Sequence, residues 1–135
     1  MAGGDTNDLR APYPKGEDGF VLLQLGPFDA QNNDSDESRY QMTVPFSFKP
    51  KKAFHTAQVV TSTPEITVQD DTGTPKVIVD GSALTAAADE ATAEEELTVE
   101  DVTIFAGAKI QVFTTAGASE ATVQSMINLW VKPVN

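Results

Sequence analysis

The chain has 135 residues, enough for one domain with a hydrophobic core and too few for two domains of ordinary size. It contains no cysteine, which excludes thiol catalysis, thiolate metal sites and disulfide bonds, and its net charge of −11 disfavours binding to nucleic acid. No segment has the roughly 20 apolar residues of a membrane-spanning helix, and the first residues do not form a secretory signal. We therefore expect a protein made in the cytoplasm, with no nucleic-acid and no membrane partner.

Residues 1–18 predict an extended N-terminal arm. Glycine, proline and charged residues alternate there, and Leu9 and Tyr13 supply its bulky apolar contacts. Such a segment buries too little surface to fold alone, so it is either disordered or ordered by a partner. The folded domain is therefore expected to span residues 19–135.

Strand patterns begin directly after the arm. Residues 20–25 form a short apolar run, and residues 39–48 alternate with a period of two. Pro45 interrupts the second segment, which favours an edge strand or a bulge. The apolar side of that segment holds Tyr40, Met42, Val44, Phe46 and Phe48.

Further short strands are predicted in the middle of the chain, with turn signals at Asp70–Gly73 and Asp80–Gly81. Short strands that are punctuated this evenly are typical of a β-sandwich or a barrel, and not of alternating strands and helices. The segments are 57–61, 65–69 and 76–79, with Ala57, Val59, Ile66 and Val68 on the inner sides of the first two.

The segment 82–96 differs in composition from its surroundings. It is rich in alanine and in acidic residues and contains no lysine or arginine. Alanine and glutamate favour a short helix, for which Leu84, Ala87, Ala88 and Ala91 would form a weak apolar stripe. A mobile acidic loop inserted between strands explains the composition equally well, so both interpretations stay open.

The last third of the chain returns to strand patterns at 97–105, 109–115 and 121–131, with turns at Ala106–Gly107 and around Gly117. A single all-β domain is therefore expected, a β-sandwich or jelly-roll-like fold of about eight antiparallel strands. Shared inner sides are predicted for Ile110 and Val112, and for Val123, Ser125, Ile127, Leu129 and Val131.

The opposite sides of the C-terminal strands carry apolar side chains where a two-layer monomer would expose polar ones. Bulky apolar side chains on consecutive strands predict a contiguous patch, and such a patch on a soluble protein is typical of a binding surface. We expect it to hold a homo-oligomer together, a dimer or a trimer by closed symmetry. The alternative is that the acidic insert or the arm folds back over it. The patch residues are Phe105, Phe113, Met126 and Trp130, with Ile78 as a further candidate.

The sequence predicts no catalytic centre and no cofactor. The single histidine, His55, follows a lysine-rich stretch, and no motif presents a nucleophile to it, so we interpret it as a surface or strand-end residue. The acidic groups Asp70–Asp71 and Glu94–Glu96 have no aromatic neighbours that would form a sugar subsite for glycoside hydrolysis. We therefore expect no enzyme activity.

Two charged stretches have a superficial likeness to ligand sites. Asn33–Ser38 begins like a calcium loop, but counted from Asp34 the required glycine is Arg39 and the required glutamate is Pro45. The three lysines of residues 49–52 are too few to overcome the acidic field of the chain, so they are expected in a solvated turn. We predict neither a metal site nor a nucleic-acid site.

Three segments carry a resemblance to a known family: Tyr40–Phe48, Ala57–Val68 and, above all, Val102–Gly117, which precedes a last apolar strand. Over residues 38–134 the chain resembles the small β-sandwich decoration, or cement, proteins on the capsids of tailed bacteriophages. The resemblance implies a virion protein that binds the outer face of a preassembled shell through the major capsid protein. It also implies a homo-oligomer, commonly a trimer, that helps the shell to resist internal DNA pressure.

The resemblance gives each predicted surface a role. It implies that the arm attaches to the capsid, with Leu9, Arg10 and Tyr13 as its contact residues, and that the C-terminal strands hold the oligomer together. Two other roles stay open. One is a receptor- or glycan-binding domain of a fibre or tail, in which Trp130, Phe105 and Tyr13 would stack on sugars. The other is a head-completion or tail component, which would form a ring.

Overall fold

The computed structural model describes residues 19–31, 38–84, 94–117 and 120–134. Three segments named above lie outside the described residues: the predicted arm with Leu9, Arg10 and Tyr13, residues 32–37 of the calcium-like stretch, and residues 85–93 of the acidic insert.

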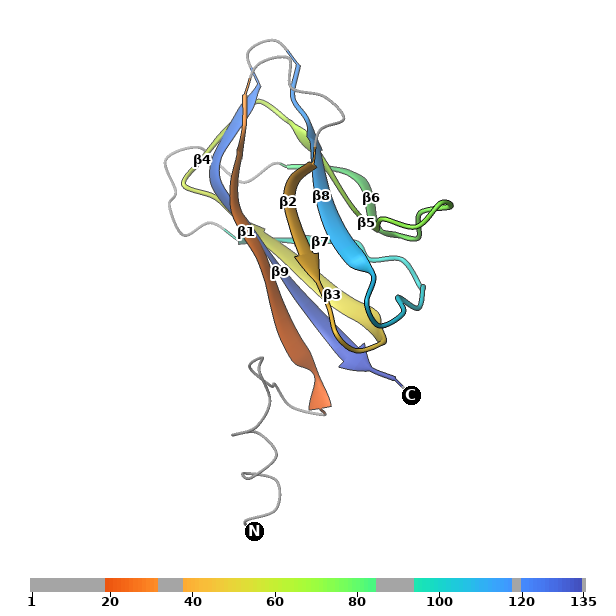
Figure 1. The fold of residues 1–135 in the computed structure, drawn as a ribbon. Helices are drawn as coiled ribbons and strands as arrows, with labels where there is room; N and C mark the ends of the chain where they lie inside the picture. The colour runs from red at the N-terminus through yellow and green to blue at the C-terminus, as the bar shows by residue number, and fades with distance from the viewer. Residues whose placement is uncertain (1–18, 32–37, 85–93, 118–119, 135) are drawn as a thin grey trace.

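Nine strands form two antiparallel sheets that pack face to face as a β-sandwich (Figure 1), and the described residues contain no α-helix. This confirms the all-β class and the antiparallel sandwich, with nine strands in place of about eight. The strands are β1 (Val21–Ala30), β2 (Ser38–Thr43), β3 (Phe48–Thr56), β4 (Val59–Thr61), β5 (Glu65–Asp70), β6 (Val77–Ala83), β7 (Glu94–Leu97), β8 (Lys109–Thr115) and β9 (Ala121–Pro133).

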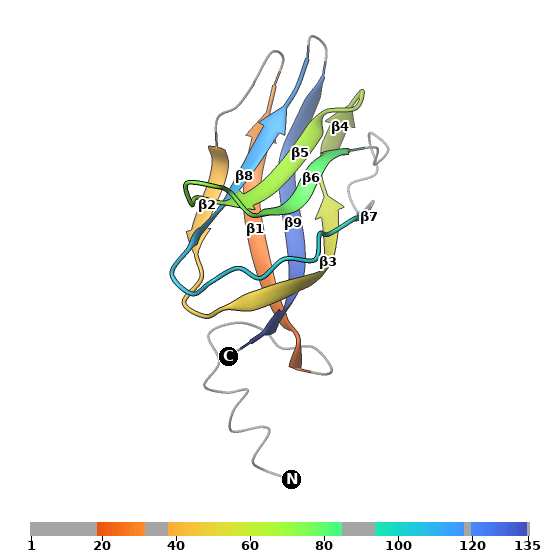
Figure 2. The same ribbon diagram turned by 90° about the vertical axis from the view of Figure 1, so that its right-hand side faces the viewer.

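The first sheet, sheet A, is built around β9, which has 13 residues. Its strand order is β1-β9-β3-β7, and β4 also pairs with β9. The second sheet, sheet B, has the order β2-β8-β5-β6 and lies in front of sheet A in Figure 2. The first and last strands of the domain are therefore neighbours, in a register that runs from Val21 opposite Val131 to Leu25 opposite Ile127.

The core lies between the two sheets and follows the alternation of the strands. Leu23 and Leu129 of sheet A and Ile66 and Ile110 of sheet B have no exposed surface. Burial of each such side chain stabilises the fold by about 1.5–3 kcal/mol. The predicted strand 109–115 and the inward placement of Ile110, Val112, Ile66 and Val68 are confirmed.

The lysine-rich stretch is a strand and not the predicted turn. Residues 39–48 do not form one strand either, because β2 ends at Thr43 and β3 begins at Phe48. Pro45 lies in the bend between them, where its missing N–H removes no ladder hydrogen bond. As a result β3 carries the lysines and continues through His55.

The predicted strand 97–105 is wrong over most of its length. Glu94–Glu96, assigned to the end of the acidic insert, forms β7 against β3 together with Leu97, the first residue of the predicted strand. Beyond it the chain makes separate backbone hydrogen bonds, from Glu100 N–H to Ile78 O and in both directions between Ile104 and Phe48. Because residues 98–105 have no continuous partner strand, they do not form a regular series of strand hydrogen bonds.

A bulge shifts the inner side of β9. Gln124 has a φ of +50°, and Thr122 and Ser125 on either side of it are both buried. Val123 is consequently half-buried and pairs with Val59. The prediction that Val123 lies on the inner side of β9 is therefore wrong. Gly81, predicted in a turn, similarly lies inside β6 with a φ of +57°.

Candidate functional site

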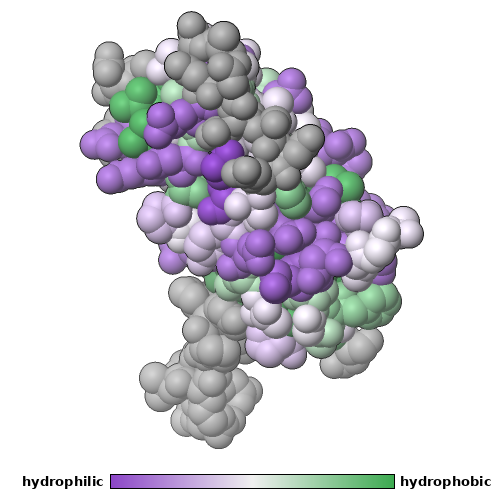
Figure 3. Space-filling model, turned by 45° about the horizontal axis from the view of Figure 1, so that its top comes forward, coloured by the Kyte–Doolittle hydropathy of each residue, from purple (hydrophilic) through white to green (hydrophobic). Residues whose placement is uncertain are grey.

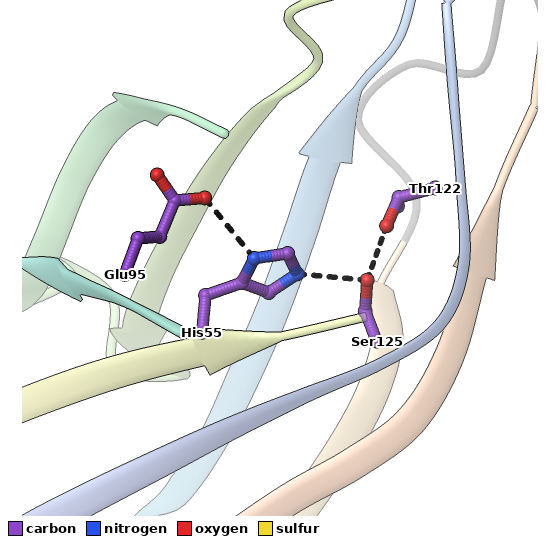
Figure 4. Close-up of polar contacts among 4 residues, drawn as sticks. All are labelled: His55, Glu95, Thr122 and Ser125. Atoms are coloured by element: carbon purple, nitrogen blue, oxygen red, sulfur yellow. Dashed lines mark hydrogen bonds and ion pairs between the residues drawn. The ribbon is translucent and has the colours of Figure 1, made fainter. Parts of the chain in front are cut away.

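A buried polar network lies around His55 on the inner side of sheet A (Figure 4). The imidazole has no exposed surface. Its Nδ1 is 3.2 Å from Glu95 Oε1, and its Nε2 is 2.9 Å from Ser125 Oγ. Ser125 Oγ in turn is hydrogen-bonded to Thr122 Oγ1. The prediction that His55 is a surface or strand-end residue is therefore wrong.

Three strands bring these residues together. His55 of β3 lies directly opposite Glu95 of β7, and on its other side β3 pairs with β9. The bulge at Gln124 turns both hydroxyl side chains, Thr122 and Ser125, inward toward the imidazole. Sequence reasoning missed the network because its members are 40 and 70 residues apart; the one available signal is a polar Ser125 inside an apolar strand.

The surroundings favour the neutral form of the histidine. Burial lowers the pKa of His55 below its usual value of 6.5, while the hydrogen bond and the negative charge of Glu95 oppose that shift. Because a carboxylate only accepts hydrogen bonds, Nδ1–H of the neutral ring donates to Glu95. Nε2 then accepts the hydroxyl proton of Ser125, and Ser125 Oγ accepts that of Thr122. Every polar atom of the imidazole is thus satisfied.

The order serine, histidine, carboxylate is that of a nucleophile, a base and a group that orients the base. Both contacts fall within or at the limit of hydrogen-bond reach. Ser125 has no exposed surface, however, and its Oγ is also held by Thr122, so a substrate carbonyl has no approach to it. The arrangement satisfies buried polar groups and ties β7, β3 and β9 together.

The residues predicted to form one apolar patch lie on different faces. Phe113 of β8 is half-buried on the outer side of sheet B, whereas Met126 and Trp130 of β9 are half-buried on the outer side of sheet A. Ile78 has no exposed surface and belongs to the core. The prediction of a contiguous patch is wrong, because β8 and β9 are consecutive in sequence but belong to opposite sheets.

Phe105 stands apart from the other predicted patch residues. It is 61% exposed, at a turn just before β8, and the Lys76 ammonium lies 4.0 Å from the centre of its ring. The turn is fixed by hydrogen bonds from Ala106 N–H to Ser47 Oγ and from Gly107 N–H to Val44 O. Phe105 is therefore an exposed aromatic side chain on an anchored loop.

The outer side of sheet A carries a group of apolar side chains, of which the sequence predicted Met126 and Trp130 but not Leu22 and Phe54. Trp130 lies opposite Leu22 of β1 and Lys52 of β3, and Phe54 lies diagonally between Trp130 and Met126. We call the half-buried residues Leu22, Phe54, Met126 and Trp130 the apolar strip; the hydrogen-bonded side chains of Gln24 and Asn128 lie among them on the same face. Sequence reasoning missed Phe54 because it follows the lysines that were assigned to a turn.

The outer side of sheet B is polar around Phe113. Gln41, Gln111 and Gln69 stand in register across β2, β8 and β5. Within the part of the chain that the structure describes, no group of three or more histidine or acidic residues is placed to hold a metal ion. The face shown in Figure 3 is likewise largely hydrophilic, with hydrophobic residues gathered in a few separate areas.

No protein-family model matches this chain, and neither does any curated protein or solved structure with which it was compared. Among the described residues there is no helix of the length and apolarity needed to cross a membrane.

Proposed function

We propose that this protein is a structural component of a virus particle. In this role it binds the outer surface of a capsid, with the major capsid protein as its partner, as a homo-oligomer that stabilises the shell. The observation that carries the proposal is the apolar strip on the outer side of sheet A, in a chain of net charge −11. Large apolar side chains on a sandwich face, here grouped around the hydrogen-bonded pair Gln24 and Asn128, favour a role in assembly.

The proposal includes no catalysis. Among the described residues, Ser125 is the hydroxyl that is hydrogen-bonded to the histidine, and its burial argues against access by a substrate. The acidic charge suits an outer surface, because packaged DNA would repel it. A mechanical role needs a stable fold and a binding face, and the apolar strip of sheet A supports the proposal that such a face exists.

The test is binding to capsids that lack this protein. Full-length chain should co-sediment with them and raise the temperature at which they release DNA. Deleting residues 1–18 should abolish co-sedimentation if the predicted arm, with Leu9, Arg10 and Tyr13, makes the attachment. Undiminished binding by the truncated chain would remove that role from the arm, and absence of the full-length chain from purified virions would overturn the decoration function.

One observation favours a second candidate, a receptor- or glycan-binding domain. The three aligned glutamines of sheet B, in the row next to Phe113, offer amide donors and acceptors beside an aromatic ring. Hydroxyl groups of a sugar are suitable partners for such a surface. A glycan array tests this second candidate function. Specific binding that disappears in Phe113→Ala would support it, and an array without binding would reject it.

A further inference from the structure

Four lysines gather at one end of the outer side of sheet A. Lys49 of β3 lies directly opposite Lys132 of β9, and Lys51 and Lys52 follow on β3 with exposed side chains. We call these four residues the lysine cluster. Sequence reasoning missed Lys132, which is 80 or more residues from the other three and reaches them through the pairing of β3 with β9.

Three members of the lysine cluster, Lys49, Lys51 and Lys52, are not explained by ion pairs among the described residues. Like charges directly opposite each other on antiparallel strands are destabilising. Lys132 has the ring of Phe20 at 5.7 Å, but Lys49, Lys51 and Lys52 make no ion pair that involves a described residue. In a chain with 9 basic and 20 acidic residues, this concentration of positive charge favours an acidic binding partner.

The acidic counterpart lies on the same face. Glu94 and Glu96 of β7 are exposed, and they point outward because Glu95 and Leu97 between and beside them point into the sandwich. Glu96 lies opposite Phe54 and Glu94 lies opposite Thr56. Along β3 the lysines therefore occupy one end of the apolar strip and the glutamates flank the other.

We infer that the outer side of sheet A binds the same face of a second copy of this chain. A two-fold axis that reverses the strand direction places the lysine cluster of one copy over Glu94 and Glu96 of the other, and the reciprocal contact forms at the same time. The apolar strips then meet between the two charged contacts. This inference rests on the homo-oligomer in the proposed function and assigns its interface.

Charge complementarity favours a second copy of this chain, over a different protein, as the partner that binds this face. A face that carries only lysines or only glutamates would repel itself, whereas one with both, separated along the strands, attracts itself in the antiparallel arrangement. The predicted interface therefore contains Trp130 and Met126, together with Leu22 and Phe54. It leaves out Phe113 and Phe105, which are not part of this strip.

The experiment exchanges the charges in full-length protein and measures association by analytical ultracentrifugation. The variants K51E/K52E and E94K/E96K change exposed side chains only, so each should keep the circular dichroism spectrum and melting behaviour of the native chain. Each alone should raise the dissociation constant by at least about tenfold, because like charges then face each other. An equimolar mixture of the two should associate as tightly as the native protein, since every reversed lysine then meets a reversed glutamate.

A matched control for E94K/E96K carries the same charge change in the other sheet. E65K/D80K alters two exposed acidic residues of β5 and β6 in sheet B and should leave association unchanged. A native chain that sediments as a 14.4 kDa monomer at micromolar concentration overturns the inference, as does a mixture that fails to recover association.

The outcome is separable from that of the decoration function. A monomer that still co-sediments with capsids would overturn the interface and leave the capsid role intact. A charge-dependent dimer that never binds capsids would support the interface and remove the capsid role.

Discussion

At the level of single residues, His55 is the most informative position. It is the only histidine of the chain, it is fully buried, and both of its ring nitrogens are engaged. Its titration is therefore not obscured by another histidine. The pH dependence of stability near neutrality should report on this one side chain.

Acidification should destabilise the protein through His55. Because burial lowers its pKa in the folded state, the unfolded chain binds the proton more readily. The stabilising contribution is complete above the unfolded pKa of 6.5 and is lost as the pH falls from there toward the folded pKa. Urea unfolding at a series of pH values between about 5.5 and 7.5 should show this loss, before carboxylates titrate. In His55→Gln the slope over that range should vanish, and an unchanged slope would contradict the assignment.

Ser125 should matter for stability and not for catalysis. Ser125→Ala removes the hydrogen-bond partner of His55 Nε2 and should lower the free energy of unfolding by about 1–3 kcal/mol. Hydrolysis of an activated ester such as p-nitrophenyl acetate should be equally slow in the native chain and in the variant. A native rate that exceeds the variant rate many-fold would instead identify Ser125 as a nucleophile.

At the level of the strands, Gly26 is the position in β1 that tolerates no side chain. Its φ is +142°, and a Cβ there would lie 2.6 Å from the carbonyl oxygen of Ser125 in β9. The same stretch of β1 is irregular in its register with β9, between Leu25 and Phe28. The bulge that turns Ser125 inward and the glycine that faces it are thus two parts of one local arrangement.

Gly26→Ala should therefore destabilise the protein by about 2 kcal/mol or more, through backbone strain and overlap with β9. Gly73→Ala is the matched control, because a Cβ at Gly73 meets nothing within 4 Å. That variant should stay within about 0.5 kcal/mol of the native stability. Thermal or urea unfolding measures both, and equal stability of the two variants would refute the steric argument.

The strands also show what the sequence can and cannot predict. The strand 109–115 was predictable because its apolar residues Ile110 and Val112 are two apart and turn signals lie on both sides of it. Residues 98–105 also contain spaced apolar residues, but only Ile104 among them has a bridge partner, and partner strands are not visible in a local pattern. The inner side of β9 was predicted with Val123 on it because a bulge at Gln124 leaves no signature in the order of apolar residues.

The candidate site was predictable only in its parts. Trp130 and Met126 were identified from their position opposite the inner residues of β9, but Leu22 and Phe54 join them through strand pairing across sheet A. The network of His55 and Ser125 depends on the same pairing. Contacts between distant segments follow from topology, which local periodicity does not determine.

At the level of the whole molecule, the first and last strands of the domain pair with each other. β1 and β9 pair over most of the length of β1, and β9 also holds β3 and β4. Sheet A is therefore assembled from segments at both extremes of the chain. Its formation requires long-range contacts, which form slowly compared with local ones.

Removal of residues 127–135 should abolish the fold, because it takes away the buried side chains Ile127, Leu129 and Val131 and the pairing partners of β1 and β3. The expected result is a circular dichroism spectrum of an unfolded chain. Removal of Val134 and Asn135 alone, beyond the end of β9, should leave the spectrum unchanged. A cooperative melting transition in the longer truncation would contradict the role assigned to β9.

The pairing of β1 with β9 also has a consequence for synthesis. Until β9 has left the ribosome, β1 has no neighbour within sheet A. Chains that stop before β9 should therefore remain unfolded and be open to proteases, so that only chains that include β9 contribute folded domains.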